Sequence, residues 1–223
     1  MSGMDASAPA TAQLLFFSGP MNSGKSTLAL QTAHTQSAHD RRGLLFTRQD
    51  RSGAPEITSR VGMSRPAVEV DDALDFWAMI VKELTSGARI DFLVCDEVQF
   101  YTPTHIDELA RVVDELGIDV FCFGILSDFR SLMFPGSRRL VELADRVETM
   151  QVQPLCWCGA RGTMNARVRE GHLVRQGEQV LIADTAEGTP AGLHYEVLCR
   201  KHFRLGMGRP LHATLSPQTL PFG

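Results

Sequence analysis

The stretch that decides the fold is Gly19-Pro20-Met21-Asn22-Ser23-Gly24-Lys25-Ser26, which lies between the apolar run Leu14-Leu15-Phe16-Phe17 and the run Thr27-Leu28-Ala29-Leu30. It matches the pattern G-x-x-x-x-G-K-S/T, and the flanking runs are typical of a strand before it and a helix after it. A loop in this position binds the phosphates of a nucleotide. The sequence therefore predicts that these eight residues hold a nucleoside triphosphate.

The residue types of this loop suit a polyphosphate. Gly19 and Gly24 let the backbone bend around the phosphates without a Cβ clash, so that main-chain N–H groups and the positive end of the following helix face the anionic oxygens. Lys25 adds a compact positive charge in a chain that has only three lysines among its 22 lysine and arginine residues. Ser26 is placed to ligate magnesium through its hydroxyl. The alternative is a Gly- and Ser-rich turn that binds nothing.

Composition limits the classes of function. A chain of 223 residues and 24.6 kDa, with 43% hydrophobic residues, can form one large domain or one domain with a small appendage. The net charge is -4 and the sequence pI is about 6.0, so no global basic field exists to hold nucleic acid without sequence preference. We therefore expect no nucleic-acid partner.

The chain also lacks the marks of export or membrane insertion. Residues 1–12 have no basic start and no long apolar run, so they are predicted to be a disordered tail rather than a signal peptide. No window approaches 18 consecutive apolar residues, so no membrane span is expected. A cytoplasmic location follows, and in that compartment the five cysteines favour metal binding or buried thiols over disulfides.

Residues 13–152 are predicted to form an α/β domain. Its apolar segments are continuous rather than alternating, which favours strands covered on both faces in a mostly parallel sheet with crossover helices, as in P-loop NTPases. The expected helices are 25–39, 72–86 and 103–116, the last with Thr102 as N-cap and Pro103 at its first position. The expected strands are 13–18, 43–47, 90–95, 119–126 and 147–152.

The chain changes character after residue 152. Residues 153–205 contain two pairs of metal-ligand side chains, with the segments 163–183 and 193–198 alternating like a long hairpin between them. The connection 184–192 has the small and turn-forming residues of a mobile flap. We expect a second, small zinc-binding lid domain here, followed by an irregular tail at 206–223.

Two adjacent carboxylates follow the strand predicted at 90–95. A carboxylate at a strand end is the expected partner of magnesium in a phosphate-loop protein, and this role is predicted for Asp96. Glu97 is then available as general base on an acceptor hydroxyl, while the metal holds Asp96 ionised. The alternative is an acidic pair at a helix start that stabilises the helix dipole.

Cys156-Trp157-Cys158 and Cys199-x-x-His202 supply three thiolates and an imidazole in two close pairs. Pairs of this kind held apart by a hairpin match a closed tetrahedral zinc site, which has a structural role and no open coordination position. The alternative is a set of unrelated surface thiols with a separate histidine, because C-x-C is less specific than C-x-x-C.

Two arginines are candidates for the charge that develops during phosphoryl transfer. Arg60 is in the polar segment Thr58-Ser59-Arg60-Val61-Gly62, and Arg130 follows Asp128-Phe129. Either could neutralise phosphate oxygens. A solvated surface role is the alternative for both.

These motifs together resemble one family. In order, they are the loop 19–26, Ser59-Arg60-Val61-Gly62, Asp96-Glu97-Val98-Gln99-Phe100, Gly124-Ile125-Leu126-Ser127-Asp128-Phe129-Arg130, Cys156-x-Cys158 and Tyr195-x-x-x-Cys199-x-x-His202. The set closely resembles the zinc-containing thymidine kinases of the human cytosolic and bacterial type, over about residues 13–205.

The resemblance implies transfer of the γ-phosphoryl group of ATP to the 5′-hydroxyl of thymidine or deoxyuridine, in pyrimidine salvage. It gives Glu97 the role of base, places Asp96 and Ser26 on magnesium, and groups Gln99 and Arg60 with the ATP and magnesium residues. It also implies a homotetramer with dTTP as feedback inhibitor, and a structural zinc.

By the same resemblance, aromatic side chains surround the base, namely Phe100 or its neighbour Tyr101, Phe129, and Tyr195 from the flap. Main-chain groups of the segment before that tyrosine recognise the base, and here these belong to Val180, Leu181, Ile182 and Ala183. Asn165 aligns with a threonine that lies near the thymine methyl group in several members. This departure at Asn165 leaves the preference between thymidine and deoxyuridine open. Ser127 is a second departure from the commonest residues of the family, and other bacterial members share it.

Two other classes of function stay open on the sequence. A phosphate-loop ATPase or switch would use Glu97 to orient water, and its zinc ribbon would dock a partner. A zinc-ribbon nucleic-acid binder would use the arginines around the cysteine pairs, which are Arg161, Arg167, Arg169 and Arg175. The acidic net charge and the complete phosphate loop argue against the second of these.

Overall fold

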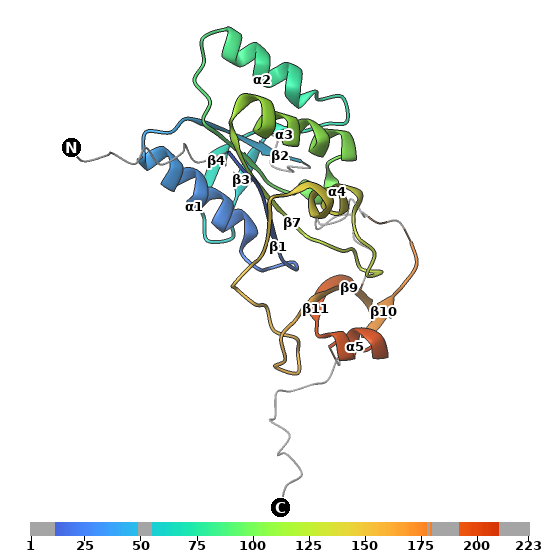
Figure 1. Cartoon of the computed structure of the whole chain (residues 1–223). Helices are drawn as coiled ribbons and strands as arrows, with labels where there is room; N and C mark the ends of the chain where they lie inside the picture. The colour runs from blue at the N-terminus through green and yellow to red at the C-terminus, as the bar shows by residue number, and fades with distance from the viewer. Residues whose placement is uncertain (1–11, 49–54, 178, 180–191, 210–223) are drawn as a thin grey trace, which may run out of the picture. The chain divides into compact units, whose positions relative to one another are not determined.

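The structure is a computed structural model that describes residues 12–48, 55–177, 179 and 192–209 (Figure 1). The chain divides into two compact units. Unit 1 contains residues 1–19, 24–126 and 134–150, and unit 2 contains residues 20–23, 127–133 and 151–223. The predicted boundary near residue 152 did not include the two short stretches that join unit 2, because both are loops flanked on each side by elements of unit 1.

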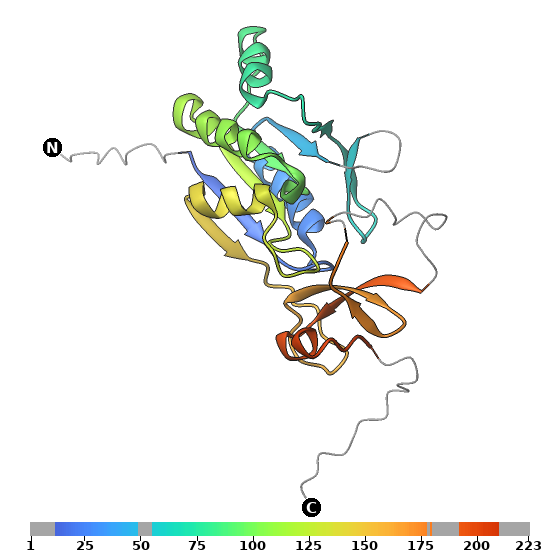
Figure 2. The same ribbon diagram turned by 90° about the vertical axis from the view of Figure 1, so that its right-hand side faces the viewer.

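Unit 1 is built on a sheet whose strands lie among the helices in Figure 2. The sheet has six strands in the order β5-β2-β6-β7-β1-β8. Every neighbouring pair in this sheet is parallel, as the continuous apolar runs predicted. The strands are β1 (Leu14–Ser18), β2 (Gly43–Thr47), β5 (Val68–Glu69), β6 (Phe92–Cys95), β7 (Asp119–Gly124) and β8 (Arg146–Thr149).

The sheet buries side chains on both faces. In β6, Leu93 and Cys95 belong to one apolar cluster while Phe92 and Val94 belong to another, as expected because successive side chains of a strand point to opposite faces. The second cluster contains the buried apolar residues of α1 (Lys25–Ala38). The first contains those of α2 (Phe76–Thr85), α3 (Pro103–Leu116) and α4 (Pro135–Leu143). The α/β fold with helices on both faces is therefore confirmed.

The helix signals at residues 102–116 are confirmed in detail. The Thr102 side chain accepts a hydrogen bond from the main-chain N–H of His105 at 3.2 Å, and Pro103 is the first helical residue. Gly117 ends α3 in the left-handed conformation with φ of 68°, which a glycine adopts without Cβ strain.

Some elements of unit 1 were missed from sequence. Helix α4 has few apolar residues, and its signals are only Pro135 at the first position and the pair Arg138 and Glu142 one turn apart. The short strands β3 (Glu56–Thr58) and β4 (Ser64–Pro66) pair in a separate two-stranded sheet, and their polar residues give little alternation. The 3-10 turn η1 (Val98–Phe100) follows β6 directly.

Unit 2 contains a three-stranded antiparallel sheet in the order β10-β9-β11. Its strands are β9 (Met164–Arg169), β10 (His172–Val174) and β11 (Leu193–Leu198), and α5 (Arg200–Leu205) follows. The expected pairing of the segment after 163 with 193–198 is present between β9 and β11, and the tight hairpin from β9 to β10 is an addition. The expected flap at 184–192 lies almost entirely outside the described residues.

Among the described residues, no helix combines the length and the apolar character that crossing a membrane requires.

Candidate active site and metal cluster

The parallel sheet brings the predicted catalytic segments to one edge. Strands β6, β7 and β1 are neighbours in the sheet, and each ends in a loop of interest. The phosphate loop follows β1, Asp96 and Glu97 follow β6, and residue 125 onward follows β7. Because the carboxyl ends of parallel strands meet at the same edge, loops distant in sequence become neighbours there.

The phosphate loop leads directly into α1. Gly24 caps α1 with φ of 80°, a left-handed conformation that few other residues adopt without strain. The Lys25 side chain is 8% exposed, and its Nζ donates to the carbonyl oxygen of Gly19 at 3.3 Å. Burial lowers the pKa of Lys25, an effect that the nearby carboxylates of Glu97 and Asp96 oppose. The loop thus brings a cation close to both acidic residues.

Asp96 is a buried carboxyl group, only 3% exposed. Burial first and the neighbouring Glu97 second raise its pKa to about 7, while a hydrogen bond with the Ser26 side chain acts in the opposite direction. The oxygens of Asp96 and Ser26 are therefore close together. Carboxylate and hydroxyl oxygens are ligands that Mg²⁺ prefers, so the donor set fits this ion.

Glu97 is held in a strained backbone conformation. Its φ is 55°, which is uncommon for any residue other than glycine and is found most often at functional sites. The Gln99 side chain donates from Nε2 to the Glu97 carboxylate, and its Oε1 accepts from the main-chain N–H of Ile125 at 3.1 Å. Gln99 therefore fixes the Glu97 side chain to the end of β7.

The two aromatic residues after Gln99 have different environments. Tyr101 is 2% exposed and packs in the core against Phe76, with ring centroids 5.8 Å apart. Phe100 is half-buried and meets Phe134 edge to face at 5.7 Å. Of the two candidates for base contact, only Phe100 remains partly accessible. Arg60 is exposed in the turn between β3 and β4, close enough that its charge helps to lower the pKa of Lys25.

In unit 2, Asn165 lies at the start of β9 and is 4% exposed. Its Oδ1 accepts from the main-chain N–H of Met21 at 2.8 Å, and its Nδ2 donates to the carbonyl oxygen of Ser127 at 3.0 Å. The N–H of Met21 therefore faces a side chain of unit 2. This differs from the expectation that successive N–H groups of the phosphate loop all face phosphate oxygens.

A buried arginine joins the two aromatic residues that the family resemblance places at the base. The guanidinium of Arg167 lies 3.8 Å from the centroid of the Phe129 ring. Its Nη2 and Nε donate to the Tyr195 hydroxyl at 2.8 and 3.1 Å. Arg167 is only 2% exposed. The sequence suggests it only as one of several possible nucleic-acid contacts, and its alternation along β9 gives no signal because the exposed Arg169 lies on the same face of the strand.

Asp128 organises the loop that carries Phe129. Its carboxylate accepts from the main-chain N–H groups of Arg130 and Leu132 at 2.8 and 3.0 Å, and from the Arg130 guanidinium at 2.7 Å. The side chain of Gln179 donates to it at 3.2 Å. Arg130, a candidate for phosphate contact, is thus engaged in an ion pair within unit 2.

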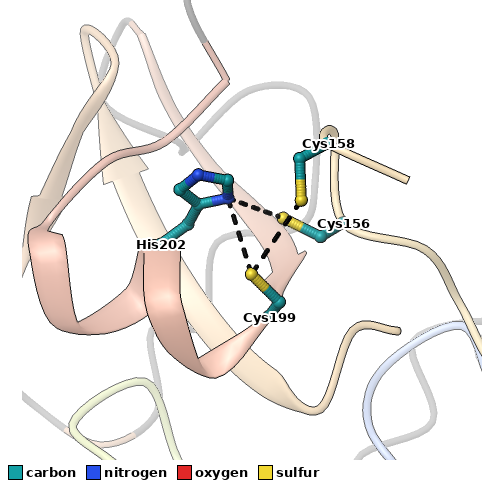
Figure 3. Close-up of side chains that lie close together, drawn as sticks. All are labelled: Cys156, Cys158, Cys199 and His202. Carbon is teal, nitrogen blue, oxygen red and sulfur yellow. Dashed lines mark hydrogen bonds between the residues drawn. The ribbon is translucent and has the colours of Figure 1, made fainter. Parts of the chain in front are cut away.

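The four predicted metal ligands gather in one cluster. The ligand atoms of Cys156, Cys158, Cys199 and His202 all lie within 4.8 Å of one another (Figure 3). Nδ1 of His202 lies 3.4 Å from the sulfur of Cys156 and 3.5 Å from that of Cys199. Three thiolates and one imidazole are the donor set of a closed structural zinc site, so the residues fit this metal.

The surroundings of the cluster support a metal-binding role. Trp157 stacks on His202 with ring centroids 4.1 Å apart, which orients the imidazole. The main-chain N–H of His202 donates to Cys199 and lowers the pKa of that thiol, whereas burial raises the pKa of Cys156. The alternative of unrelated surface thiols does not fit this arrangement.

Comparison with known proteins decides the family. The thymidine kinase family model matches residues 12–203. The chain belongs to the thymidine kinase family. Members of this family are ATP-dependent phosphotransferases. A phosphate loop with a nearby acidic residue is typical of enzymes that transfer phosphoryl groups.

Three thymidine kinases illustrate the relationship. The protein from Cutibacterium acnes is 60% identical over 212 residues, covering 95% of this chain and 97% of its own length. Those from Streptomyces coelicolor and Streptomyces avermitilis are 53% and 50% identical over 211 residues, each covering 94% of this chain and 97% of the relative.

Among solved structures, a Bacteroides Pif1 bound to ssDNA has a TM-score of 0.30 and 15% identity, over 61% of this chain and 34% of that chain. A likeness at this level carries no argument about function.

Within the thymidine kinase family, the candidate site residues of this chain fall into two groups. Unit 1 contains Lys25, Ser26, Asp96, Glu97 and Gln99, and unit 2 contains Asn165, Phe129, Tyr195 and the metal cluster. Unit 1 also contains the candidates Gly19, Gly24, Arg60, Phe100 and Tyr101, and unit 2 contains residues 20–23 of the loop. The candidates Val180, Leu181, Ile182 and Ala183 lie outside the described residues.

Proposed function

We propose that this chain transfers the γ-phosphoryl group of ATP to the 5′-hydroxyl of thymidine, giving dTMP and ADP, with Glu97 as the general base. The observation that carries the proposal is the group at the end of β6, where Glu97 is strained, hydrogen-bonded by Gln99 and close to Lys25. Membership of the thymidine kinase family supplies the reaction and the two substrates, thymidine and ATP.

The arrangement divides the work between the two carboxyl groups. Asp96 is buried and hydrogen-bonded to Ser26, so it is suited to a metal rather than to a mobile proton. Glu97 is partly exposed, so it can reach an acceptor hydroxyl and take its proton. Gln99 keeps the Glu97 carboxylate in one orientation and so reduces the entropy lost on reaching the transition state.

The phosphate side of the reaction belongs to the loop after β1. The loop from Gly19 to Ser26 would cradle the triphosphate through its main-chain N–H groups other than that of Met21, which donates to Asn165, with Lys25 neutralising the phosphate charge. Ser26 and Asp96 would hold Mg²⁺, which when bound supplies positive charge for the phosphate oxygens. Arg60 is exposed and near Lys25, so it could neutralise the negative charge of the same phosphate oxygens.

The nucleoside side of the reaction would use aromatic residues. Tyr195 is a candidate for packing around the base because it is partly exposed and its hydroxyl is held by Arg167. Phe129 is a candidate from the family resemblance alone, because it is 2% exposed and the Arg167 guanidinium lies against its ring. Phe100 remains a candidate since it is partly accessible, whereas the core position of Tyr101 makes it a support for Phe100. The family resemblance assigns base recognition to residues 180–183, and that part stays a prediction.

A product assay tests the proposal against the ATPase alternative. The protein is incubated with magnesium-ATP and each nucleoside in turn, and ADP, free phosphate and nucleotide products are measured. We expect ADP formation that depends on thymidine and releases no free phosphate. Release of phosphate at the same rate without any nucleoside would instead establish an ATPase.

The base assignment has its own test. Glu97→Gln should lower kcat by about 100-fold to 10,000-fold, because the amide cannot accept the hydroxyl proton, while ATP affinity stays nearly unchanged. Glu69→Gln is a matched control, since Glu69 is exposed on β5. Near-normal turnover of Glu97→Gln would remove Glu97 from the mechanism.

Three further features belong to this proposal and rest on the family resemblance. They are a homotetrameric assembly, feedback inhibition by dTTP, and a cytoplasmic location, which is typical of thymidine kinases.

A further inference from the structure

The strand β9 has two faces with different chemistry. Ala166 and Val168 are fully buried in the apolar cluster of unit 2, together with the metal ligands Cys156 and Cys199. Asn165 and Arg167 alternate with them and are buried on the opposite face. One strand therefore contacts the core of the metal-binding lid with one face and presents two polar side chains with the other.

The contacts of Asn165 join two loops that are distant in sequence. One is the phosphate loop, through the N–H of Met21, and the other is residues 127–133, through the carbonyl of Ser127. Both loops cluster with the lid in unit 2. Because the amide is buried and uses both its oxygen and its nitrogen, neither loop can shift without losing a hydrogen bond inside the protein.

The two loops serve different substrates in the proposed function. Met21 belongs to the loop that would bind ATP. Ser127 precedes Asp128, whose side chain holds residues 128–132 in a tight turn, and Phe129 in that turn is a candidate for contact with thymidine. Through its Nδ2, Asn165 therefore contacts a segment whose position should change or become fixed when thymidine binds.

We propose that Asn165 is a positioning residue that couples the binding of ATP to the binding of thymidine. This inference rests on the proposed function and adds to it. A nucleoside that holds Phe129 in one position also holds the neighbouring Ser127 in place. Because Asn165 is hydrogen-bonded to both Ser127 and Met21, it then restricts the main chain of Met21 as well. Coupling of this kind is reciprocal, so ATP must strengthen thymidine binding by the same factor.

The test uses two variants of equal shape. Asn165→Val removes both hydrogen bonds, and Asn165→Thr has the same β-branched shape with one hydroxyl that can accept from Met21 or donate to Ser127. Arg169→Gln is the control, because Arg169 is exposed on the same strand. Zinc content and melting temperature, measured for each variant, report whether unit 2 is still folded.

Calorimetry then measures the affinity of a non-hydrolysable ATP analogue with and without saturating thymidine. For the natural chain and for Arg169→Gln we expect thymidine to tighten analogue binding by about 5-fold or more, within the usual range of coupling between sites. For Asn165→Val the factor should fall to about 1, with Asn165→Thr between the two. In steady-state assays Asn165→Val should raise the KM for ATP by about 10-fold.

Specific results would overturn the inference. One is a natural chain whose analogue affinity does not respond to thymidine, and another is an Asn165→Val variant with unchanged coupling. If Asn165→Val does not fold, Asn165→Thr decides, because coupling equal to that of the natural chain in this variant would contradict a need for both bonds. Failure of the proposed function is a different outcome, since it would appear as a natural chain with no thymidine-dependent ADP formation.

Discussion

Asp96 and Arg167 show how burial sets the behaviour of single polar residues in this protein. Each is almost fully removed from water, and each is near groups of suitable charge or hydrogen-bonding capacity. Burial of a carboxyl group or a guanidinium is costly unless partners compensate. We therefore expect Asp96 to respond to pH and to metal binding, and Arg167 to respond to removal of one of its partners.

The titration of Asp96 makes stability depend on pH. The pKa of Asp96 is about 7 in the folded protein, whereas it is 3.8 for an aspartate that makes no such interactions, as in the unfolded chain. The folded state therefore holds the proton more tightly than the unfolded state. The contribution of Asp96 to the free energy of unfolding is then complete below pH 3.8 and is lost as the pH rises through about 7. Each pH unit within this window should remove up to about 1.4 kcal/mol.

Urea unfolding at pH 5 and pH 8, in buffer without added magnesium, measures this loss. Asp96→Asn cannot ionise, so its stability should change less between the two pH values than that of the natural chain. Added Mg²⁺ should stabilise the natural chain at pH 8 and have little effect on Asp96→Asn. A pH dependence identical in the two proteins would contradict the assignment to Asp96.

Arg167 should act on thymidine binding through Tyr195. Arg167→Met keeps the length of the side chain but removes both hydrogen bonds to the Tyr195 hydroxyl and the contact of the charge with Phe129. Loss of a hydrogen bond to a charged group costs about 1.5 to 3 kcal/mol, so kcat/KM for thymidine should fall by about 10-fold to 100-fold.

A double-mutant cycle with Tyr195→Phe checks this interpretation. Because Tyr195→Phe removes the same hydrogen bonds and keeps the ring, adding it to Arg167→Met should cost little more than Arg167→Met alone. Fully additive losses in kcat/KM would show that the two side chains act independently.

At the scale of elements, the site of unit 1 depends on the packing of η1 against α4. A Cβ built on Gly136 of α4 would lie 2.5 Å from the carbonyl oxygen of Val98 and 2.6 Å from that of Tyr101. Both oxygens belong to the main chain around η1, which follows Glu97 directly. The absence of a side chain at residue 136 thus allows the approach that positions Glu97 and Gln99.

Gly136→Ala should therefore lower kcat strongly while lowering the melting temperature only a little. The added methyl group displaces η1, and a small displacement of a catalytic group has a large effect on rate, so kcat should fall by about 10-fold or more. Gly87→Ala is the comparison, since Gly87 has φ of 91° and no atom within 4 Å of a built Cβ, so this change costs backbone strain only. Melting temperature and kcat of both variants are measured, and equal kcat values would contradict the prediction.

The three-stranded sheet of unit 2 should depend on its metal. Among the residues that the structure describes, its apolar cluster contains six buried residues, and two of them, Cys156 and Cys199, are metal ligands. So small a core does not support a fold by itself, whereas metal binding supplies free energy of folding. Removal of zinc should raise hydrogen exchange in β9, β10 and β11, and leave β1, β6 and β7 protected.

Zinc analysis with cysteine variants completes this test. Cys158→Ser should lose the bound zinc, and its exposed position means that little packing is lost with the sulfur. Cys122→Ala should retain about one zinc per chain, because Cys122 is buried in β7 of unit 1 and is not one of the four clustered ligands. Equal zinc content in the two variants would refute the predicted ligand set.

At the scale of the whole molecule, the family resemblance predicts assembly into a tetramer. Several large apolar side chains of the described residues are exposed, including Val61 at 70%, Leu155 at 67% and Leu132 at 57%. Light scattering after gel filtration should give a mass near four times the 24.6 kDa of one chain. A mass of one chain at micromolar concentration would remove the assembly from the proposed function.

The sequence was sufficient for the local features of this protein. Residues 14–26 predict a strand, a phosphate loop and a helix because the signals are contiguous, and the close spacing within each cysteine pair predicts the metal cluster. Thr102 and Pro103 similarly set the start of α3. Each of these features depends on residues that are neighbours along the chain.

The tertiary structure alone decided which distant residues meet. Gln99 reaches Ile125, Asn165 reaches Met21, and Arg167 reaches Tyr195 because strand register and loop packing bring them together. Nothing in the local sequence separates the buried Arg167 from the exposed Arg169, or Tyr101 in the core from Phe100 beside it. Burial and pairing result from the packing of the whole chain, and a pattern of neighbouring residues does not contain that information.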